Sequence, residues 1–278
     1  MKFRTEIEIK RSPRLISHKD RLMTVGSCFS DAIGSRLLRD GFDVSVNPMG
    51  ILFNPLSIAN MFERALESRL YGIDDLFRSD DGIYHCLDFE SRRQSNDADG
   101  LLRDLNRDFG QFSDRLLKAD RIFVTFGTAW VFKHIPSRDK IVGNCHKLQD
   151  RDFKRELCTV EDITSRWESL TQRLPIVFTV SPVRHLNNGL HGNTLSKAIL
   201  QLAVSRLDNS EYFPAFEILL DDLRDYRFYA DDLKHPSKAG EDYVYERFGE
   251  MFFSRETLSL ASEYRRKSMF EAHRQIIK

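Results

Sequence analysis

The chain has no long apolar run, no excess of either charge and no paired cysteine motif. No hydrophobic stretch approaches the ~18 apolar residues that a membrane-spanning helix needs, so we expect no membrane span. The 42 Lys and Arg residues balance the 42 Asp and Glu residues, which argues against nucleic acid or an anionic membrane as a partner. The N-terminal segment MKFRTEIEIKRSPR lacks the apolar core of a signal peptide. These absences predict a cytoplasmic protein.

Cysteine is scarce and scattered. The chain contains Cys28, Cys86, Cys145 and Cys158, with no Cys-x-x-Cys pair. This usage is typical of a reducing compartment rather than of a disulfide framework. The doublets His85-Cys86 and Cys145-His146 suggest zinc ligands, but adjacent side chains point in different directions and structural zinc sites separate paired ligands by about two to four residues. We therefore expect no metal and no other cofactor.

The chain does hold enough apolar material for one large core. With 278 residues and 41% hydrophobic residues, it suits a single α/β domain with insertions. Strand-like runs at 22–25, 121–126, 175–181 and 212–217 alternate with amphipathic helical segments. Such repeats predict a parallel sheet covered on both faces. We expect one domain over residues 1–255, with an insertion around 71–118, and a helical extension over 256–278.

Local signals place several smaller elements. Alternation of apolar and polar residues over 3–10 predicts an edge strand or arm. Asn54 followed by Pro55 is typical of a helix start, and Thr159 with Asp162 forms a capping-box pattern for a helix over 160–173. Further predictions from the sequence are a short strand at 44–46, a hairpin limb from 130 to 135, a turn at 142–144, a helix beginning near 193 and a final helix over 257–276.

The segment LMTVGSCFSDAIGSRLL, residues 22–38, combines an apolar strand, a tight turn and a helix. The strand ends at Gly26, and Ser27 and Cys28 follow it at once. Unpaired backbone N–H groups and the positive end of the helix dipole stabilise a thiolate or an oxyanion at such a position. The turn therefore predicts a nucleophile at Ser27 or Cys28.

Other polar segments are predicted at the same edge of the sheet, because ligands bind at the carboxyl ends of parallel strands. Residues 127–130, residues 181–185 and the segment around His235 join the turn there. Asp232 precedes His235 by three residues, so its carboxylate can hold the imidazole while His235 takes a proton from the nucleophile. Ser237 is placed to cap the next helix. His185 is equally consistent with a structural role and with substrate binding or service as a second base.

Five motifs in this order resemble the GSCFA family. They are GSCFS at 26–30, NPMGILFNP at 47–55, FGTAWVF at 126–132, SPVRH at 181–185 and LRDYRFYADDLKHPSKAG at 223–240. The family is grouped with the SGNH (GDSL-type) hydrolases, and the resemblance covers nearly all of the chain up to about residue 255. It implies a flavodoxin-like three-layer sandwich with a central parallel sheet and helical and loop insertions. It also implies an esterase-like or acyl-transferring site.

The resemblance implies roles for individual residues of this chain. Asp232 and His235 match the Asp-x-x-His pair, and Gly50 matches the oxyanion-hole glycine. In the first motif, GSCFS, Cys28 stands where the relatives have the nucleophilic serine. The resemblance implies that a thiol there is activated by a lowered pKa. Ser27 stays a rival, since a shift of one residue in the turn exchanges the two.

The third motif, FGTAWVF, departs from the family pattern, because Ala129 stands where the relatives have an oxyanion-binding asparagine. Losing one such donor typically costs about 10²- to 10³-fold in rate. Asn54, Thr128 and the Trp130 indole N–H are candidate replacements among which the sequence does not choose.

Two functions remain open at this point. One is a covalent esterase or O-acyltransferase acting on a small-molecule or carbohydrate ester, with a separate acyl donor as an option. Kinship with SGNH acyl-modifying enzymes suggests surface-polysaccharide modification. The other is a non-catalytic module that holds a glycan or an acyl ligand in the same crevice. The sequence does not indicate an oligomeric state.

Overall fold

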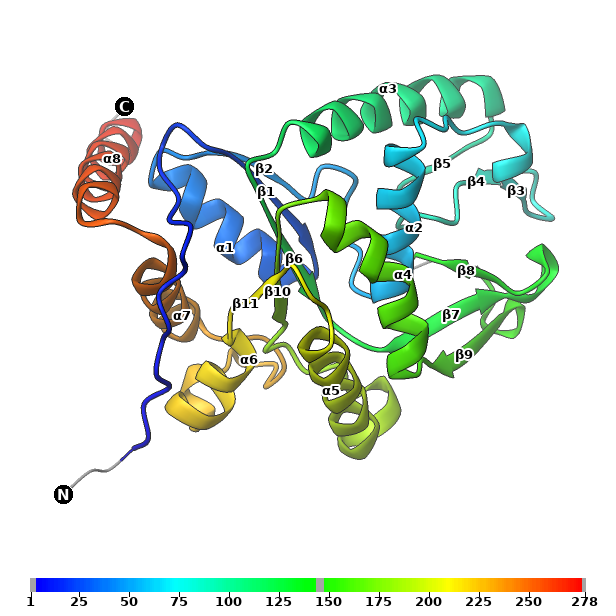
Figure 1. The fold of residues 1–278 in the computed structure, drawn as a ribbon. Helices are drawn as coiled ribbons and strands as arrows, with labels where there is room; N and C mark the ends of the chain where they lie inside the picture. Colours follow the sequence, from blue (N-terminus) through cyan, green and yellow to red (C-terminus); the bar gives the residue numbers. More distant parts are fainter. Residues whose placement is uncertain (1–3, 144–147, 277–278) are drawn as a thin grey trace.

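The computed structural model describes residues 4–143 and 148–276, and its centre is a parallel sheet (Figure 1). The sheet strands are β1 (Arg21–Gly26), β2 (Asp43–Val46), β6 (Arg121–Phe126), β10 (Ile176–Val180) and β11 (Glu211–Tyr212). Their spatial order is β11-β10-β6-β1-β2, and all neighbours are parallel. This order is the flavodoxin-like arrangement, whose topological switch point lies between β1 and β6. The predicted fold class is confirmed.

Helices cover both faces of the sheet and complete the three layers (Figure 1). One face carries α1 (Cys28–Arg39) and α7 (Lys238–Phe252). The opposite face carries α2 (Pro55–Leu66), α3 (Ala98–Leu117), α4 (Val160–Arg173) and α5 (Gly189–Ser205). Successive strand residues alternate between the layers: Leu22 packs in the core beside α1 and Met23 in the core beside α2. The last helix, α8 (Arg255–Ile276), lies at the periphery beside α1.

Helix starts follow the capping signals of the sequence. The Asn54 side chain accepts a hydrogen bond from the Ser57 N–H at the start of α2. Thr159 and Asp162 form the predicted reciprocal capping box of α4. Ser237 caps α7 by accepting from the Gly240 N–H. These caps satisfy N–H groups that a helix leaves unpaired, which is why short polar side chains mark the boundaries so reliably.

Two small antiparallel sheets lie beside the main body (Figure 1). One contains β3 (Phe77–Arg78), β4 (Tyr84–His85) and β5 (Gln94–Ser95), and the other contains β7 (Trp130–His134), β8 (Lys140–Val142) and β9 (Phe153–Leu157). Short helical segments occupy 73–75, 135–137, 150–152, 186–188, 215–217 (α6), 218–223 (a π-helix) and 226–228. Within the predicted 71–118 insertion, α3 instead packs Phe109 and Phe112 into the main core.

Of the two forms predicted for the 3–10 segment, its described part is an arm rather than an edge strand: Ile7 and Ile9 pack on the core beside α7, and the Ile7 carbonyl accepts a hydrogen bond from Arg247. Three other local predictions are wrong. The predicted strand at 212–217 is β11 alone, because Pro214 has no N–H to continue the ladder and α6 follows. Val142 belongs to β8 rather than to a turn, and residue 144 of that prediction lies outside the described residues. Helix α5 begins at Gly189, four residues before the predicted start at 193.

Within the described residues, no helix combines the length and apolarity needed to cross a membrane. The same residues contain no cluster of three or more His, Cys, Asp or Glu side chains able to hold a metal ion. The Cys145-His146 doublet lies outside them. Cys28, Cys86 and Cys158 are free thiols.

Candidate active site

The turn after β1 is held in place by the neighbouring strand. Gly26 has a φ of +142°, and a Cβ at this position would lie 2.2 Å from the Thr125 carbonyl oxygen of β6. Only glycine therefore allows β1 to approach β6 this closely before the chain turns. The Ser27 N–H then donates to the same Thr125 carbonyl at 3.2 Å, which fixes where α1 begins.

Ser27 and Cys28 have different environments. Ser27 is fully buried, and its hydroxyl oxygen accepts a hydrogen bond from the Phe29 N–H as the N-cap of α1. Cys28 is the first residue of α1 and is only partly buried. Because a nucleophile must reach its substrate, this geometry favours Cys28 over Ser27.

The helix N-terminus alone does not activate the Cys28 thiol. Burial raises the pKa of Cys28, and the Asp31 carboxyl one turn along α1 raises it further. The N–H groups of Cys28 and Phe29 lower the pKa in part. The expected lowered pKa is therefore wrong for this thiol as it stands, because burial and a nearby acid outweigh the helix dipole.

Asp232 and His235 form the predicted pair on the turn before α7. His235 Nδ1 lies 2.6 Å from Asp232 Oδ2, and the backbone N–H groups of Lys234 and His235 donate to Asp232 Oδ1. These donors hold the pKa of the Asp232 carboxyl well below its usual range. The contact assigns the proton to Nδ1 and leaves Nε2 as the imidazole atom that can accept a proton. Both side chains are about half exposed.

The Gly50 N–H is not available as an oxyanion donor in this structure. It donates to the Asn47 carbonyl at 2.8 Å, closing a tight turn in which Gly50 has a φ of +92°. The side-chain amide of Asn47 in turn accepts a hydrogen bond from the Gly26 N–H and donates one to the Asp31 carboxylate. Gly50 therefore shapes the loop that supports the β1 turn, which corrects the role that the resemblance implies for it.

The three proposed replacements for the missing asparagine are also engaged elsewhere. The Asn54 side-chain amide donates to the Ser57 hydroxyl and to the Val142 carbonyl. The Thr128 hydroxyl contacts the Ser196 hydroxyl and accepts from the Trp130 N–H. The Trp130 indole donates to the Gly192 carbonyl at 3.2 Å. The side-chain donors of Asn54 and Trp130 are therefore engaged in the scaffold, while in the contact between the Thr128 and Ser196 hydroxyls either oxygen can donate.

His185 lies between the edge of the sheet and the turn that carries Asp232 and His235 (the late turn). Its ring packs 4.9 Å from that of Phe53, and its Nε2 is buried with no hydrogen-bond partner among the described residues. Burial, Lys197 and His235 together lower the pKa of His185 to about 3. The imidazole is therefore neutral near pH 7, which suits a hydrogen bond to substrate and argues against a second general base.

Lys197 is a site residue that the sequence reasoning missed. It lies on α5 with 2% of its surface exposed, and its ammonium group is 2.6 Å from the carbonyl oxygens of Gly127 and Ser181. Those residues directly follow β6 and β10. Burial lowers the pKa of Lys197 to about 7. The available signal was its position on the apolar stripe of the helix, in register with Leu200 and Val204.

The predicted segments do meet at one edge of the sheet. The Arg184 N–H donates to the Lys234 carbonyl at 3.0 Å, which joins the loop after β10 to the late turn. Electrostatic interactions then link Cys28 to Lys197, Lys197 to His185 and His185 to His235. Across the described residues, no hydrogen bond joins the His235 imidazole to Cys28 or Ser27.

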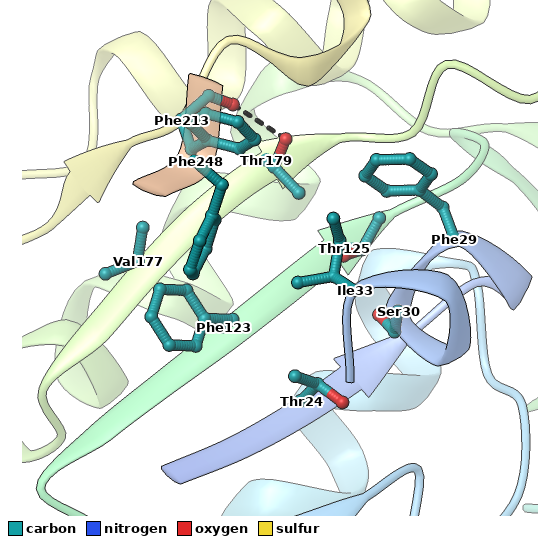
Figure 2. Close-up of a pocket in the computed structure, with 10 residues that line it drawn as sticks. All are labelled: Thr24, Phe29, Ser30, Ile33, Phe123, Thr125, Val177, Thr179, Phe213 and Phe248. Carbon is teal, nitrogen blue, oxygen red and sulfur yellow. Dashed lines mark hydrogen bonds between the residues drawn. The ribbon is translucent and has the colours of Figure 1, made fainter. Parts of the chain in front are cut away.

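A cleft of about 610 Å³ opens beside His185. Its lining combines aromatic rings with polar groups: Phe53, Phe132, Gly143, Asp150, Phe153, Arg155 and Asn187. Figure 2 shows a different cavity, of about 10 Å³, enclosed between α1, α7 and the sheet and lined by Phe29, Ser30, Phe123 and Phe248 among others. That cavity has room for roughly one water molecule, so it is too small for a substrate. A further pocket of about 280 Å³, lined by Arg184, Asn193 and Lys197 among others, lies beside the loop after β10.

The family model described as the GSCFA family matches residues 21–248. The match includes Cys28, Lys197, Asp232 and His235. No curated protein and no solved structure gives a significant match to the chain. The chain therefore belongs to the GSCFA family.

Proposed function

We propose that this GSCFA-family protein is an SGNH-like esterase or O-acyltransferase that works through an acyl-enzyme on Cys28. One observation carries the proposal: a partly buried thiol at the N-terminus of α1 lies at the topological switch point, on the sheet edge that also gathers the Asp232–His235 pair. A carboxylate that orients an imidazole suits proton transfer, whereas a site that only binds has no need of it.

In the proposed reaction, His235 takes the proton of the Cys28 thiol, and the resulting thiolate attacks the ester carbonyl carbon and forms a C–S bond. The N–H groups at the start of α1 stabilise the resulting oxyanion. The bond to the leaving oxygen then breaks, and protonated His235 gives that oxygen a proton. In the second half, His235 removes a proton from water or a sugar hydroxyl, whose oxygen attacks the thioester. The C–S bond breaks and the thiolate returns.

The cleft supports a carbohydrate as one of the two reactants. Phe132 and Phe153 line it with aromatic side chains, and Asp150, Arg155 and Asn187 add hydrogen-bonding groups. Binding sites for small polar molecules combine apolar walls with a few such groups. Transfer to a sugar hydroxyl, as in polysaccharide modification, would be the reaction if water is kept from the thioester. We propose that the protein acts in the cytoplasm, because its described cysteines are free thiols.

A direct test is to trap the acyl-enzyme. Wild type, Cys28→Ala and Ser27→Ala are incubated with p-nitrophenyl acetate, quenched in acid and measured by intact mass. We expect one acetyl group on wild type and Ser27→Ala, removed by hydroxylamine as thioesters are, and none on Cys28→Ala. Labelling with a fluorophosphonate at Ser27 would instead move the nucleophile by one residue.

The alternative is a binding module on a degenerate SGNH scaffold. The engagement of Gly50, Asn54 and Trp130 in scaffold hydrogen bonds favours it, because an acyl-transfer site normally keeps such donors for the oxyanion. A folded wild type that forms no acyl adduct with short or long p-nitrophenyl esters, yet binds a glycan measured by calorimetry, would establish this alternative.

A further inference from the structure

The loop after β10 borders two separate pockets. Asn187 lines the cleft of about 610 Å³, whereas Pro182 and Arg184 line the pocket of about 280 Å³, which we call the Arg184 pocket. Among the described residues, the two have no lining residue in common. The Arg184 pocket lies between this loop, α5 and the helical segment at 215–223 (Figure 1). Two pockets at one loop suit an enzyme that must hold two organic reactants.

The charged side chains that line the Arg184 pocket are both cations. They are Arg184 and Lys197, and no Asp or Glu side chain lines the pocket within the described part of the chain. Much of the remaining wall is apolar, with Leu190, Phe216 and Leu219 among its residues. Ligand pockets of this kind use apolar walls to bury the body of a small molecule and a few polar groups to fix its orientation. The lining therefore favours an anionic group on an apolar body.

Arg184 is held in place without an ion pair. Its backbone N–H donates to the Lys234 carbonyl at 3.0 Å, and its guanidinium carbon is 4.3 Å from the ring centroid of Tyr229. Asp221 and Asp225 line a neighbouring pocket together with Arg184, yet neither forms a salt bridge with it. A guanidinium that stacks on a ring keeps its N–H donors at its edge, in the fork geometry that binds a carboxylate or a phosphate through two hydrogen bonds.

Lys197 and Asn193 add hydrogen-bond donors to the same pocket. Lys197 is 2% exposed, and its nitrogen lies 2.6 Å from two backbone carbonyl oxygens and 5.8 Å from the ring centroid of Phe216. An ammonium group has three N–H donors, so the two carbonyls leave one. The Asn193 side-chain oxygen accepts from the His185 N–H at 3.0 Å, which leaves the amide N–H groups of Asn193 for a ligand. A buried cation needs a partner, and an anion in this pocket supplies one.

We propose that the Arg184 pocket binds the carboxylate or phosphate group of an amphipathic molecule, with Arg184 as its anchor and Lys197 and Asn193 as further donors. The role of that molecule rests on the proposed function: it is the acyl donor of a transferase, and the cleft of about 610 Å³ holds the acceptor. The acyl carbon of the donor bonds to the Cys28 sulfur and its C–O bond breaks. The oxygen of the anion-bearing part then takes the proton from His235.

The first test measures the binding of hexanoate, hexyl phosphate and hexanol by isothermal titration calorimetry. We expect wild type to bind at least one of the two anions more tightly than hexanol, and the preferred anion identifies the charged group. Arg184→Gln should weaken the binding of that anion by about tenfold or more, because it removes a charged donor. Arg227→Gln is the matched control, since Arg227 also lies over an aromatic ring but does not line the pocket. Equal affinities for the anions and hexanol, or equal anion affinities in wild type and Arg184→Gln, would overturn the proposal.

Asn193→Asp covers the case in which Arg184→Gln does not fold. Aspartate keeps an oxygen that can accept from the His185 N–H, and it adds a negative charge to the pocket. The affinity for the anion should therefore fall by about tenfold or more while that for hexanol changes little. An unchanged affinity for the anion would overturn the proposal.

None of these measurements needs ester turnover, so the two proposals can fail separately. A protein that binds the anion through Arg184 but forms no acyl-enzyme with p-nitrophenyl acetate would keep the binding site and refute the proposed function. A protein that forms the acyl-enzyme on Cys28 but binds neither anion would keep the function and refute the binding site.

Discussion

Among single residues, Asp232 offers the sharpest test of acid–base chemistry. Its carboxylate accepts from His235 Nδ1, so Asp232→Asn would place an amide N–H donor against that atom and favour the opposite tautomer. We expect the turnover rate on a p-nitrophenyl ester to fall by about 10²-fold or more, with little change in thermal unfolding because both side chains are half exposed. The neighbouring exposed Asp231→Asn is the control, and a similar loss there would contradict the assignment.

The pH dependence of the same turn follows from its lowered pKa. A carboxyl whose folded pKa lies below its unfolded pKa contributes stability above the unfolded value and loses that contribution as pH falls through the folded one. Donors from Lys234 and His235 lower the pKa of Asp232. The turn therefore keeps its ionised carboxylate down to pH values below the ordinary range of aspartate. If activity falls at mildly acidic pH, we therefore expect the cause to be the protonation of a group other than Asp232.

At this scale the sequence predicts the candidate reacting groups better than it predicts the groups that surround them. Gly26, Ser27, Cys28 and the Asp232–His235 pair are visible from local spacing, because one turn positions each of them. The engagement of the Gly50 N–H by Asn47 depends on the path of a loop. The burial of Lys197 depends on α5 packing over the adjacent ends of β6 and β10, which no local pattern records.

Among the secondary elements, α2 shows how a scaffold role can be separated from a catalytic one. Asn54 caps this helix and also donates to the Val142 carbonyl of β8. Asn54→Ala should lower the free energy of unfolding by about 1–2 kcal/mol, measured by urea denaturation, while the folded protein keeps its rate of acylation. Thr159→Ala, which removes the cap of α4, is the matched control. Lost acylation with unchanged stability would return Asn54 to the oxyanion site.

Elements with strong local signals were predictable, and elements defined by their neighbours were not. Strand β6 is buried throughout and α4 has a full capping box, so burial pattern and cap both mark them. Strand β11 pairs through Glu211 and Tyr212 alone, because Pro214 has no N–H to continue the ladder and α6 follows it. The alternating segment near the N-terminus predicts an edge strand or an arm, and it is an arm packed against α7 because no sheet edge lies beside it to pair with.

For the molecule as a whole, the parallel order of the sheet makes the site. Strands β1, β6 and β10 are adjacent and end at one edge, so the turn after β1, Gly127 and Ser181 meet although they are far apart in sequence. The late turn reaches that edge through the hydrogen bond between Arg184 and Lys234. A change that leaves this edge intact should leave the chemistry of Cys28 intact, even where it costs stability elsewhere.

Helix α8 provides a test of whether stability can change without a change in the chemistry of Cys28. Asp40, at the end of α1, is fully buried and accepts hydrogen bonds from Arg265 of α8, from Arg39 and from the Tyr245 hydroxyl. Arg265→Met removes one partner of a buried carboxylate, so we expect the free energy of unfolding to fall by about 1–3 kcal/mol. The exposed neighbour Arg266→Met should change it little. Because Asp40 follows the far end of α1 from Cys28, the pH midpoint of Cys28 alkylation should not move. A shifted midpoint would mean that α8 controls the site through α1.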